Sequence, residues 1–411
     1  MTTLQVLSVL FAVAAIFGML CTRWLRLPVT IGTMLLTVIT SVALGSARSL
    51  APGLHEWALD FAHQIDFQSI ILHGMLPLLL FAGAFLLDIE QINRERLSIS
   101  ILAIAGTIAS TFAVAGLIFI FSGSQINWLQ CLVFGALISP TDPIAVLEML
   151  RRAGVSSAIR AQLAGESLFN DGVGAVLFIG MLQLAQGNGN TPLHLAWTLV
   201  LKSGGAALLA LAAAWLVSTL MQRVEAYQVD ILFTLALALG GYVLADLLHL
   251  SGPLEAVVAG LALRVFNRRQ SSPHIAHRQI DQFWEVIDEI QNSVLFVLLG
   301  LEILVVTFDW TNLRNGLAAI VSVNLVRFAA VVVILLLVRT IQRGHKSSAL
   351  VLTWGGLRGG LSIALALSVP EVLGRSWMLS ATYIVVVFSI LLQGGSMNWI
   401  LRHLQHRGVS A

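Results

Sequence analysis

Long apolar stretches recur through this chain, and they restrict its possible folds more than any other feature. Most are about as long as a helix that crosses the hydrocarbon core of a bilayer, roughly 20 residues. They are continuous rather than alternating, which favours helices over the strands of a membrane barrel. The stretches lie at roughly 3–22, 28–45, 69–87, 97–122, 128–150, 159–186, 193–222, 227–249, 252–267, 291–308, 315–341, 347–369 and 377–401. The sequence therefore predicts an all-α polytopic membrane protein with about 13 transmembrane helices.

The composition supports a single membrane-embedded domain. Of the 411 residues, 57% are hydrophobic and 11% are charged, whereas soluble proteins average about 25% charged residues. Two segments, 50–66 and 273–290, mix polar and apolar residues and are expected to lie at the membrane interface. The sequence indicates neither a soluble regulatory domain nor a basic surface for nucleic acid. Residues 1–411 are therefore interpreted as one membrane domain.

The lysine and arginine residues indicate how the predicted spans are oriented. When the loops are assigned alternately to two sides of the membrane, one side receives 17 of these cations and the other receives 3. Cytoplasmic loops carry the excess of lysine and arginine. We therefore expect a protein of the cell (inner) membrane with its N-terminus outside and its C-terminus in the cytoplasm.

The apolar segments between residues 135 and 178 contain carboxylates within two conspicuous motifs. Asp142 belongs to the motif SPTDP at 139–143, and Glu166 and Asp171 belong to the motif GESLFNDG at 165–172. A charge in the hydrocarbon core is costly, so such residues usually face a watery cavity and mark an ion or proton pathway. These segments therefore predict an ion transporter, with its binding site in this part of the chain.

Two of the predicted spans contain residues that interrupt a helix. Span five carries Pro140 and Pro143, which lack backbone donors, and span twelve carries the motif GGLRGG at 355–360. Each is the fifth member of a group of six spans, and the groups begin near residues 3 and 227, with span seven as linker. Transporters built from inverted repeats have broken helices at such corresponding positions, so we expect both helices to unwind and cross. The alternative is that the prolines only kink span five and the glycines only permit close packing.

Side chains that carry oxygen gather around the first break. Ser167 and Asp171 are four residues apart and share one helix face. Glu166 and Asn170 share the adjacent face. Together with the Thr141 hydroxyl and freed backbone carbonyls, such oxygens suit a small hard cation. A site that holds either a proton or a cation lets each ligand displace the other, and this competition is sufficient for exchange.

The motifs also resemble those of a known family of transporters. SPTDP at 139–143, GESLFNDG at 165–172 and GGLRGG at 355–360 are similar to motifs of the cation:proton antiporter superfamily, in particular to prokaryotic NhaP/NHE-type sodium/proton exchangers. The segments 78–87 and 296–302 add to the resemblance, which covers essentially the whole chain. It implies a homodimer in which a transport bundle, about 69–186 and 291–401, shifts like an elevator against a scaffold of the remaining spans.

The resemblance implies roles for individual residues of the site. Asp171 is the expected carrier of the cation and the proton. Asp142, Thr141 and Ser167 are the expected co-ligands, and Asn170 is the expected polar neighbour of Asp171. The transported ions are then a proton and a monovalent cation, which we expect to be sodium, with lithium and potassium left open.

Two further expectations follow from the resemblance. Glu166 and Arg358 should form a structural ion pair that ties span six to span twelve. Asn170 stands where electrogenic relatives carry a second aspartate, and Arg327 is the basic residue on span eleven. This pattern resembles the electroneutral branch of the family, which exchanges one cation for one proton.

Other functions stay open on the sequence alone. A potassium/proton antiporter would use the same ligands, and a channel would be distinguished only by its turnover rate. An intramembrane aspartyl protease would use Asp142 and Asp171 as a catalytic dyad, but the flanking prolines and charged neighbours do not suit one. We expect no enzymatic activity, no cofactor and no nucleic-acid partner. The sequence assigns no definite role to three further acids, Asp88, Glu90 and Glu255.

Overall fold

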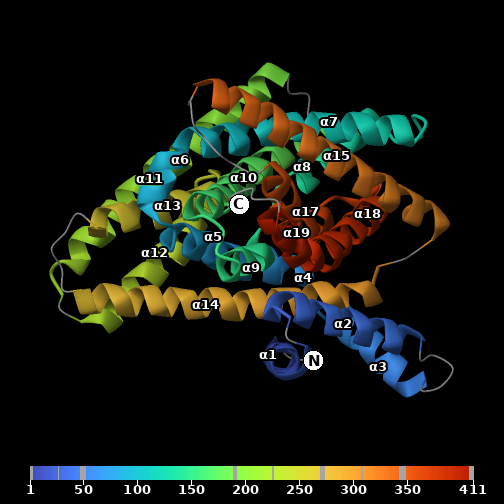
Figure 1. Cartoon of the computed structure of the whole chain (residues 1–411), viewed down its shortest axis with the longest axis horizontal. Coiled ribbons are helices and arrows are strands. Elements are labelled where there is room, and N and C mark those ends of the chain that lie inside the picture. Colours follow the sequence, from blue (N-terminus) through green and yellow to red (C-terminus); the bar gives the residue numbers. More distant parts are fainter. Residues whose placement is uncertain are drawn as a thin grey trace.

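The structure is a computed structural model that describes residues 3–25, 27–46, 52–187, 192–224, 226–268, 274–306, 309–341 and 349–406. Within these ranges the chain is helical and has no β-strand. In Figure 1, α10 (Ser157–Ala185) and α17 (Gly360–Leu367) lie near the middle of the bundle, and α14 (His274–Leu301) runs along one edge. Some cations used to predict the orientation lie outside the described residues, namely Arg26, Arg48, Arg269, Arg343, Lys346 and Arg407.

The remaining helices follow in chain order. The first half of the chain forms α1 (Thr3–Leu20), α2 (Val29–Ser46), α3 (Pro52–His63), α4 (Phe67–Ser69), α5 (Leu76–Phe85), α6 (Ile89–Ser100), α7 (Thr107–Phe121), α8 (Trp128–Ile138) and α9 (Ile144–Arg152). The second half forms α11 (Pro192–Met221), α12 (Tyr227–Leu247), α13 (Gly252–Arg268), α15 (Trp310–Ile341), α16 (Ala349–Gly355), α18 (Arg375–Val387) and α19 (Gly395–His406). Wider turns of the π type at Ile70–Met75, Ile101–Gly106 and Phe388–Gly394 join α4 to α5, α6 to α7 and α18 to α19. Short 3₁₀ turns lie at Glu302–Leu304 and Glu371–Leu373.

The predicted all-helical membrane fold is confirmed, but the count of thirteen spans is not. Each predicted span overlaps a helical segment. Among the described residues, nine segments are long and apolar enough to cross a membrane, and the bent pair α16–α17 makes ten. The shortfall of three has physical causes: the break between α8 and α9 divides one predicted span, α13 has only 17 residues, and the predicted span 291–308 is continuous with the charged part of α14. The number thirteen therefore stays a prediction.

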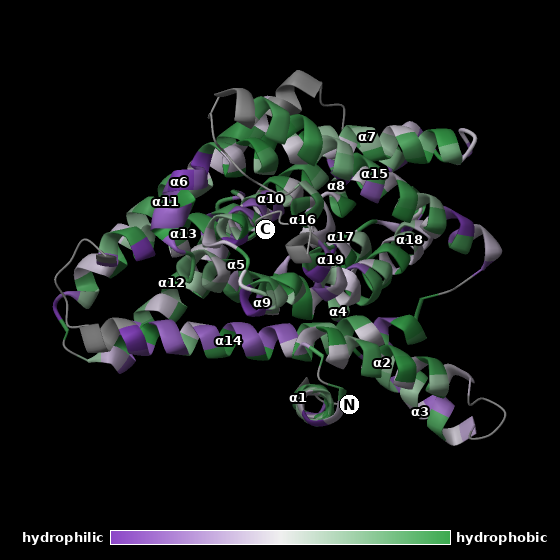
Figure 2. Ribbon diagram, in the orientation of Figure 1, coloured by the Kyte–Doolittle hydropathy of each residue, from purple (hydrophilic) through white to green (hydrophobic). Residues whose placement is uncertain are grey.

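Helix α14 differs from the sequence prediction. The segment 273–290 was expected at the membrane interface and 291–308 as a separate span, but one helix of 28 residues runs from His274 to Leu301. Figure 2 shows that much of its length is hydrophilic. Trp284 anchors this part: its ring lies 4.8 Å from that of Phe81 on α5, and its Nε1 donates to Thr234 Oγ1 on α12 at 3.0 Å. These contacts bring the polar part of α14 into the bundle.

Helix α13 lies very close to α5, and a glycine makes this possible. A Cβ atom on Gly260 would stand 2.6 Å from the carbonyl oxygen of Phe81, so no larger residue fits without moving a backbone. The contact places α5 firmly beside α13. The position of α5 is important because its residues Leu79, Leu80 and Gly83 line a cavity of about 500 Å³, which is described below.

Candidate cation site at the crossing of two broken helices

Both predicted breaks are present, and the two unwound segments meet. Helix α8 ends at Ile138 and α9 begins at Ile144, while α16 ends at Gly355 and α17 begins at Gly360 after a bend of 44°. The backbone nitrogen of Asp142 donates a 2.8 Å hydrogen bond to the carbonyl oxygen of Leu357. The prediction that both helices unwind and cross is therefore confirmed, and the alternative of simple kinks is wrong.

The first break follows from its prolines and from local capping. Pro140 and Pro143 cannot donate the hydrogen bonds that would continue α8. The Asp142 carboxylate accepts a 3.1 Å bond from the backbone nitrogen of Ile144, so it caps the first turn of α9. Arg358 supplies donors on the other side: its guanidinium donates to the carbonyl oxygens of Ser139 and, at 2.7 Å, of Pro140. Carbonyls freed by the break are thus satisfied by the partner segment.

Helix α10 holds Thr141 from the opposite side. The Asn170 amide oxygen accepts from the Thr141 backbone nitrogen at 3.1 Å, and the Asn170 Nδ2 donates to the Thr141 hydroxyl at 2.7 Å. Ser167 Oγ donates to the Thr141 carbonyl oxygen at 2.5 Å. The structure thus brings Thr141, Ser167 and Asn170 together, and Asn170 contacts the unwound backbone.

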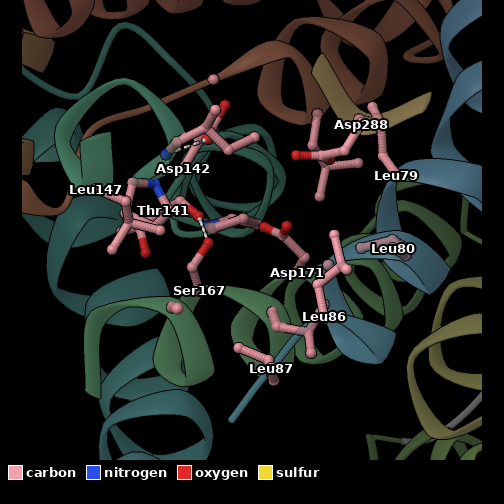
Figure 3. Close-up of a pocket in the computed structure, with 18 of the residues that line it drawn as sticks. Leu79, Leu80, Leu86, Leu87, Thr141, Asp142, Leu147, Ser167, Asp171 and Asp288 are labelled. Carbon is pink, nitrogen blue, oxygen red and sulfur yellow. Dashed lines mark hydrogen bonds between the residues drawn. The ribbon is translucent and has the colours of Figure 1, made fainter. Parts of the chain in front are cut away.

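Asp142 and Asp171 face the same cavity. Its volume is about 500 Å³, and Thr141, Asp142, Ser167 and Asp171 all line it. Figure 3 shows the carboxylates of Asp142 and Asp171 among these side chains, with the short bond between Ser167 and Thr141 beside them. Both aspartates are partly exposed to the cavity, whereas Ser167 and Thr141 are buried. Carboxylate, hydroxyl and carbonyl oxygens around one space can replace the hydration shell of a small cation.

A third aspartate, for which the sequence predicted no role in the site, also lines this cavity. Asp288 on α14 lies at the far side of the cavity in Figure 3. It was missed because segment 273–290 was placed at the membrane interface. Asp288 and Asn292 are four residues apart on one face, so the polar face runs past the predicted end of that segment. Asp88 also lines the cavity, as do two other charged residues, Glu148 and Arg151.

The predicted ion pair between Glu166 and Arg358 is wrong, because Glu166 has a different partner. Glu166 is paired with Arg327 on α15, and the bond between Arg327 Nη2 and Glu166 Oε2 measures 3.0 Å. Arg327 Nη2 also donates to the Leu352 carbonyl oxygen of α16 at 2.9 Å. Arg358 instead bonds the carbonyls of the first break, although it borders the same small void as Glu166 and Arg327. Glu166 thus ties α10 to α15, and Arg358 ties the two broken helices together.

Crossed, broken helices with carboxylates at the crossing are the architecture of secondary transporters. The sequence is consistent with this class, because the family "Sodium/hydrogen exchanger, transmembrane" matches residues 8–403. The protein belongs to this family.

Individual relatives support the assignment. The chain is 39% identical over 393 residues to a protein of Pseudomonas aeruginosa named Na(+)/H(+) antiporter NhaP, covering 93% of this chain and 92% of that one. It is 29% identical to the Na(+)/H(+) antiporter NhaH of Halobacillus dabanensis, covering 82% of this chain and 84% of that one. The solved structure of the sodium proton antiporter MjNhaP1 from Methanocaldococcus jannaschii has the same fold, with a TM-score of 0.74 at 19% identity over 97% of each chain.

Proposed function

We propose that the protein is a secondary active antiporter that exchanges sodium ions for protons. The observation that carries the proposal is the shared cavity of Asp142 and Asp171 at the crossing of two broken helices. The names of the relatives from Pseudomonas aeruginosa and Halobacillus dabanensis support sodium as the cation and antiport as the activity. Potassium/proton exchange and proteolysis have no comparable support.

In this mechanism Asp171 carries the cation and the proton in turn. A cation at Asp171 is also coordinated by Asp142 and by oxygens of Thr141 and Ser167, which all line the cavity. A proton on Asp171 removes the negative charge that the cation needs, so the two ligands exclude each other. Only a loaded site crosses the membrane, because an uncompensated carboxylate is costly to move through a dry barrier.

The cavity of Asp142 and Asp171 opens, in our proposal, to the cytoplasm. Its rim includes Asp88, Arg151 and Arg160, which lie at or near the helix ends that the lysine and arginine count places there. The N-terminus is then outside and the C-terminus inside the cell membrane. We further propose a homodimer whose transport bundle, about 69–186 and 291–401, moves against the remaining scaffold. Such exchange would serve pH and sodium homeostasis.

The exchange is proposed to be electroneutral. Asn170, which holds Thr141, occupies the position beside Asp171 where a second carboxylate would add a charge. The Arg327 charge is already engaged by Glu166. One exchangeable carboxylate charge therefore accompanies one cation or one proton.

The function is tested in proteoliposomes that contain a pH-sensitive dye. Addition of sodium to the parent protein should move protons, and lithium and potassium added in turn give the cation preference. Asp171→Asn should abolish the signal in a protein that is still folded. Asp246→Asn is the matched control, because Asp246 is an exposed aspartate on α12 that does not line the cavity. Full sodium-driven activity of a well-folded Asp171→Asn protein would refute the assignment of the site.

A further inference from the structure

A second cavity of about 380 Å³ lies at the other end of α17. Leu367, the last residue of α17, lines it, whereas Gly360, the first residue, lines the cavity of Asp142 and Asp171. A helix of this length spans about 12 Å, so the two cavities are separated by little more than one short helix. The remaining walls come from the α3–α4 connection, the segment after α14 and the start of α18.

Glu302 is a buried carboxylate in the wall of this second cavity. It follows α14 directly, in the 3₁₀ turn Glu302–Leu304, and its side chain is only 1% exposed. Its Oε2 atom has no hydrogen-bond partner among the residues that the structure describes. A buried carboxylate without compensation is unfavourable, and a bound cation relieves that cost.

The other two carboxylates of the cavity are already engaged. Glu371 is paired with Arg375, and Asp66 accepts a 3.0 Å bond from the backbone nitrogen of Ser69 at the start of α4. The lining therefore contains three carboxylates against one guanidinium and one imidazole, that of His63, and of the three carboxylates only Glu302 is deeply buried. An acidic cavity with low-dielectric walls concentrates cations.

We propose that Glu302 is a docking site for the transported monovalent cation on the side of the membrane opposite to the cavity of Asp142 and Asp171. A cation bound at Glu302 lies near the C-terminal end of α17, and it can move to Asp171 once the transport bundle exposes Asp171 to the second cavity. The inference rests on the proposed function.

The test measures exchange in membrane vesicles of both orientations. Right-side-out vesicles report the apparent KM for sodium at the outer face, and everted vesicles report it at the cytoplasmic face. For Glu302→Gln, we expect the outer KM to rise roughly threefold or more, since local attraction of the cation is lost. The cytoplasmic KM and the rate at saturating sodium should match those of the parent. Glu371→Gln is the comparison, because it makes the same charge change at an exposed carboxylate of the cavity that is paired with Arg375, and it should raise the outer KM less than Glu302→Gln does.

A second variant covers the case in which Glu302→Gln does not accumulate. Gln68→Lys adds a positive charge to the same cavity without altering Glu302, and it should raise the outer KM alone. An outer KM equal to that of the parent in these variants overturns the inference, as does an equal change at both faces. A change only in the pH dependence of exchange, with the sodium KM constant, also overturns it, because Glu302 would then hold a proton. A parent protein that exchanges no sodium refutes the proposed function instead.

Discussion

Glu166 on α10 and Arg327 on α15 form a two-pronged ion pair in the interior of the bundle, and each of the two guanidinium nitrogens contacts a different carboxylate oxygen. Both side chains are buried, and the pair also reaches α16 through the Leu352 carbonyl. Removal of one partner would strand the other charge. The pair therefore links α10, α15 and α16.

Glu166→Gln or Arg327→Gln should lower the stability of the protein. Each change leaves one buried charge alone, at a cost of roughly 3–5 kcal/mol. The double variant should recover part of this loss, because it strands no charge. Thermal melting in detergent measures the effect, and Arg314→Gln, an exposed arginine on the same helix, is the control. Variants that melt like the parent but bind sodium much more weakly would place Glu166 among the ligands.

Gly359→Ala should reduce exchange strongly without unfolding the protein. A Cβ atom at this position would collide with the carboxylate of Asp142, which then has to leave its place. The initial rate of sodium-driven proton movement measures the effect. Gly395→Ala is the matched control, since its added methyl group meets no atom within 4 Å. Equal rates in both variants would show that the position of the Asp142 carboxylate does not matter.

Asn170→Asp should retain measurable exchange, whereas Asn170→Ala should lose most of it. An aspartate can still accept from the Thr141 nitrogen and from its hydroxyl, but alanine leaves the unwound backbone without this support. Exchange rates of the two variants, compared at equal protein amount, decide the matter. A fully active alanine variant would contradict the positioning role of Asn170.

Exchange should neither create nor respond to a membrane potential. One cation and one proton share the single negative charge of Asp171, so the loaded site has the same charge in both directions. The measurement imposes a potential with potassium and valinomycin on proteoliposomes that contain the protein. Strong acceleration of sodium-driven proton movement by the potential would disprove the one-to-one stoichiometry.

The breaks in the helices were predictable because their causes are local. Pro140 and Pro143 lack the donors a helix needs, and this is a property of the residues themselves. The partner of Glu166 was not predictable in the same way. Two arginines, Arg327 and Arg358, lie within predicted spans, and the choice between them depends on how α15 and the second break are rotated toward α10. Spacing along one helix carries no information about the rotation of another.

Hydropathy also did not predict that α14 is one continuous helix. Hydropathy measures where polar residues end and apolar ones begin, near residue 290, but helical hydrogen bonds continue through that change. Asp288 was consequently assigned to a surface helix, although it lines the cavity of Asp142 and Asp171. The backbone hydrogen bonds of a helix do not depend on whether its side chains are polar or apolar.

The length of α14 has a mechanical consequence. Trp284, in the first half of the helix, is bonded to Thr234 of α12, and Gly300 near its C-terminal end abuts Thr37 of α2. An uninterrupted helix bends only gently. A displacement of one part of α14 is therefore transmitted along the helix, which behaves as a rigid rod. The helix ends at the turn Glu302–Leu304, so residue 291 lies inside a continuous helix and not at its end.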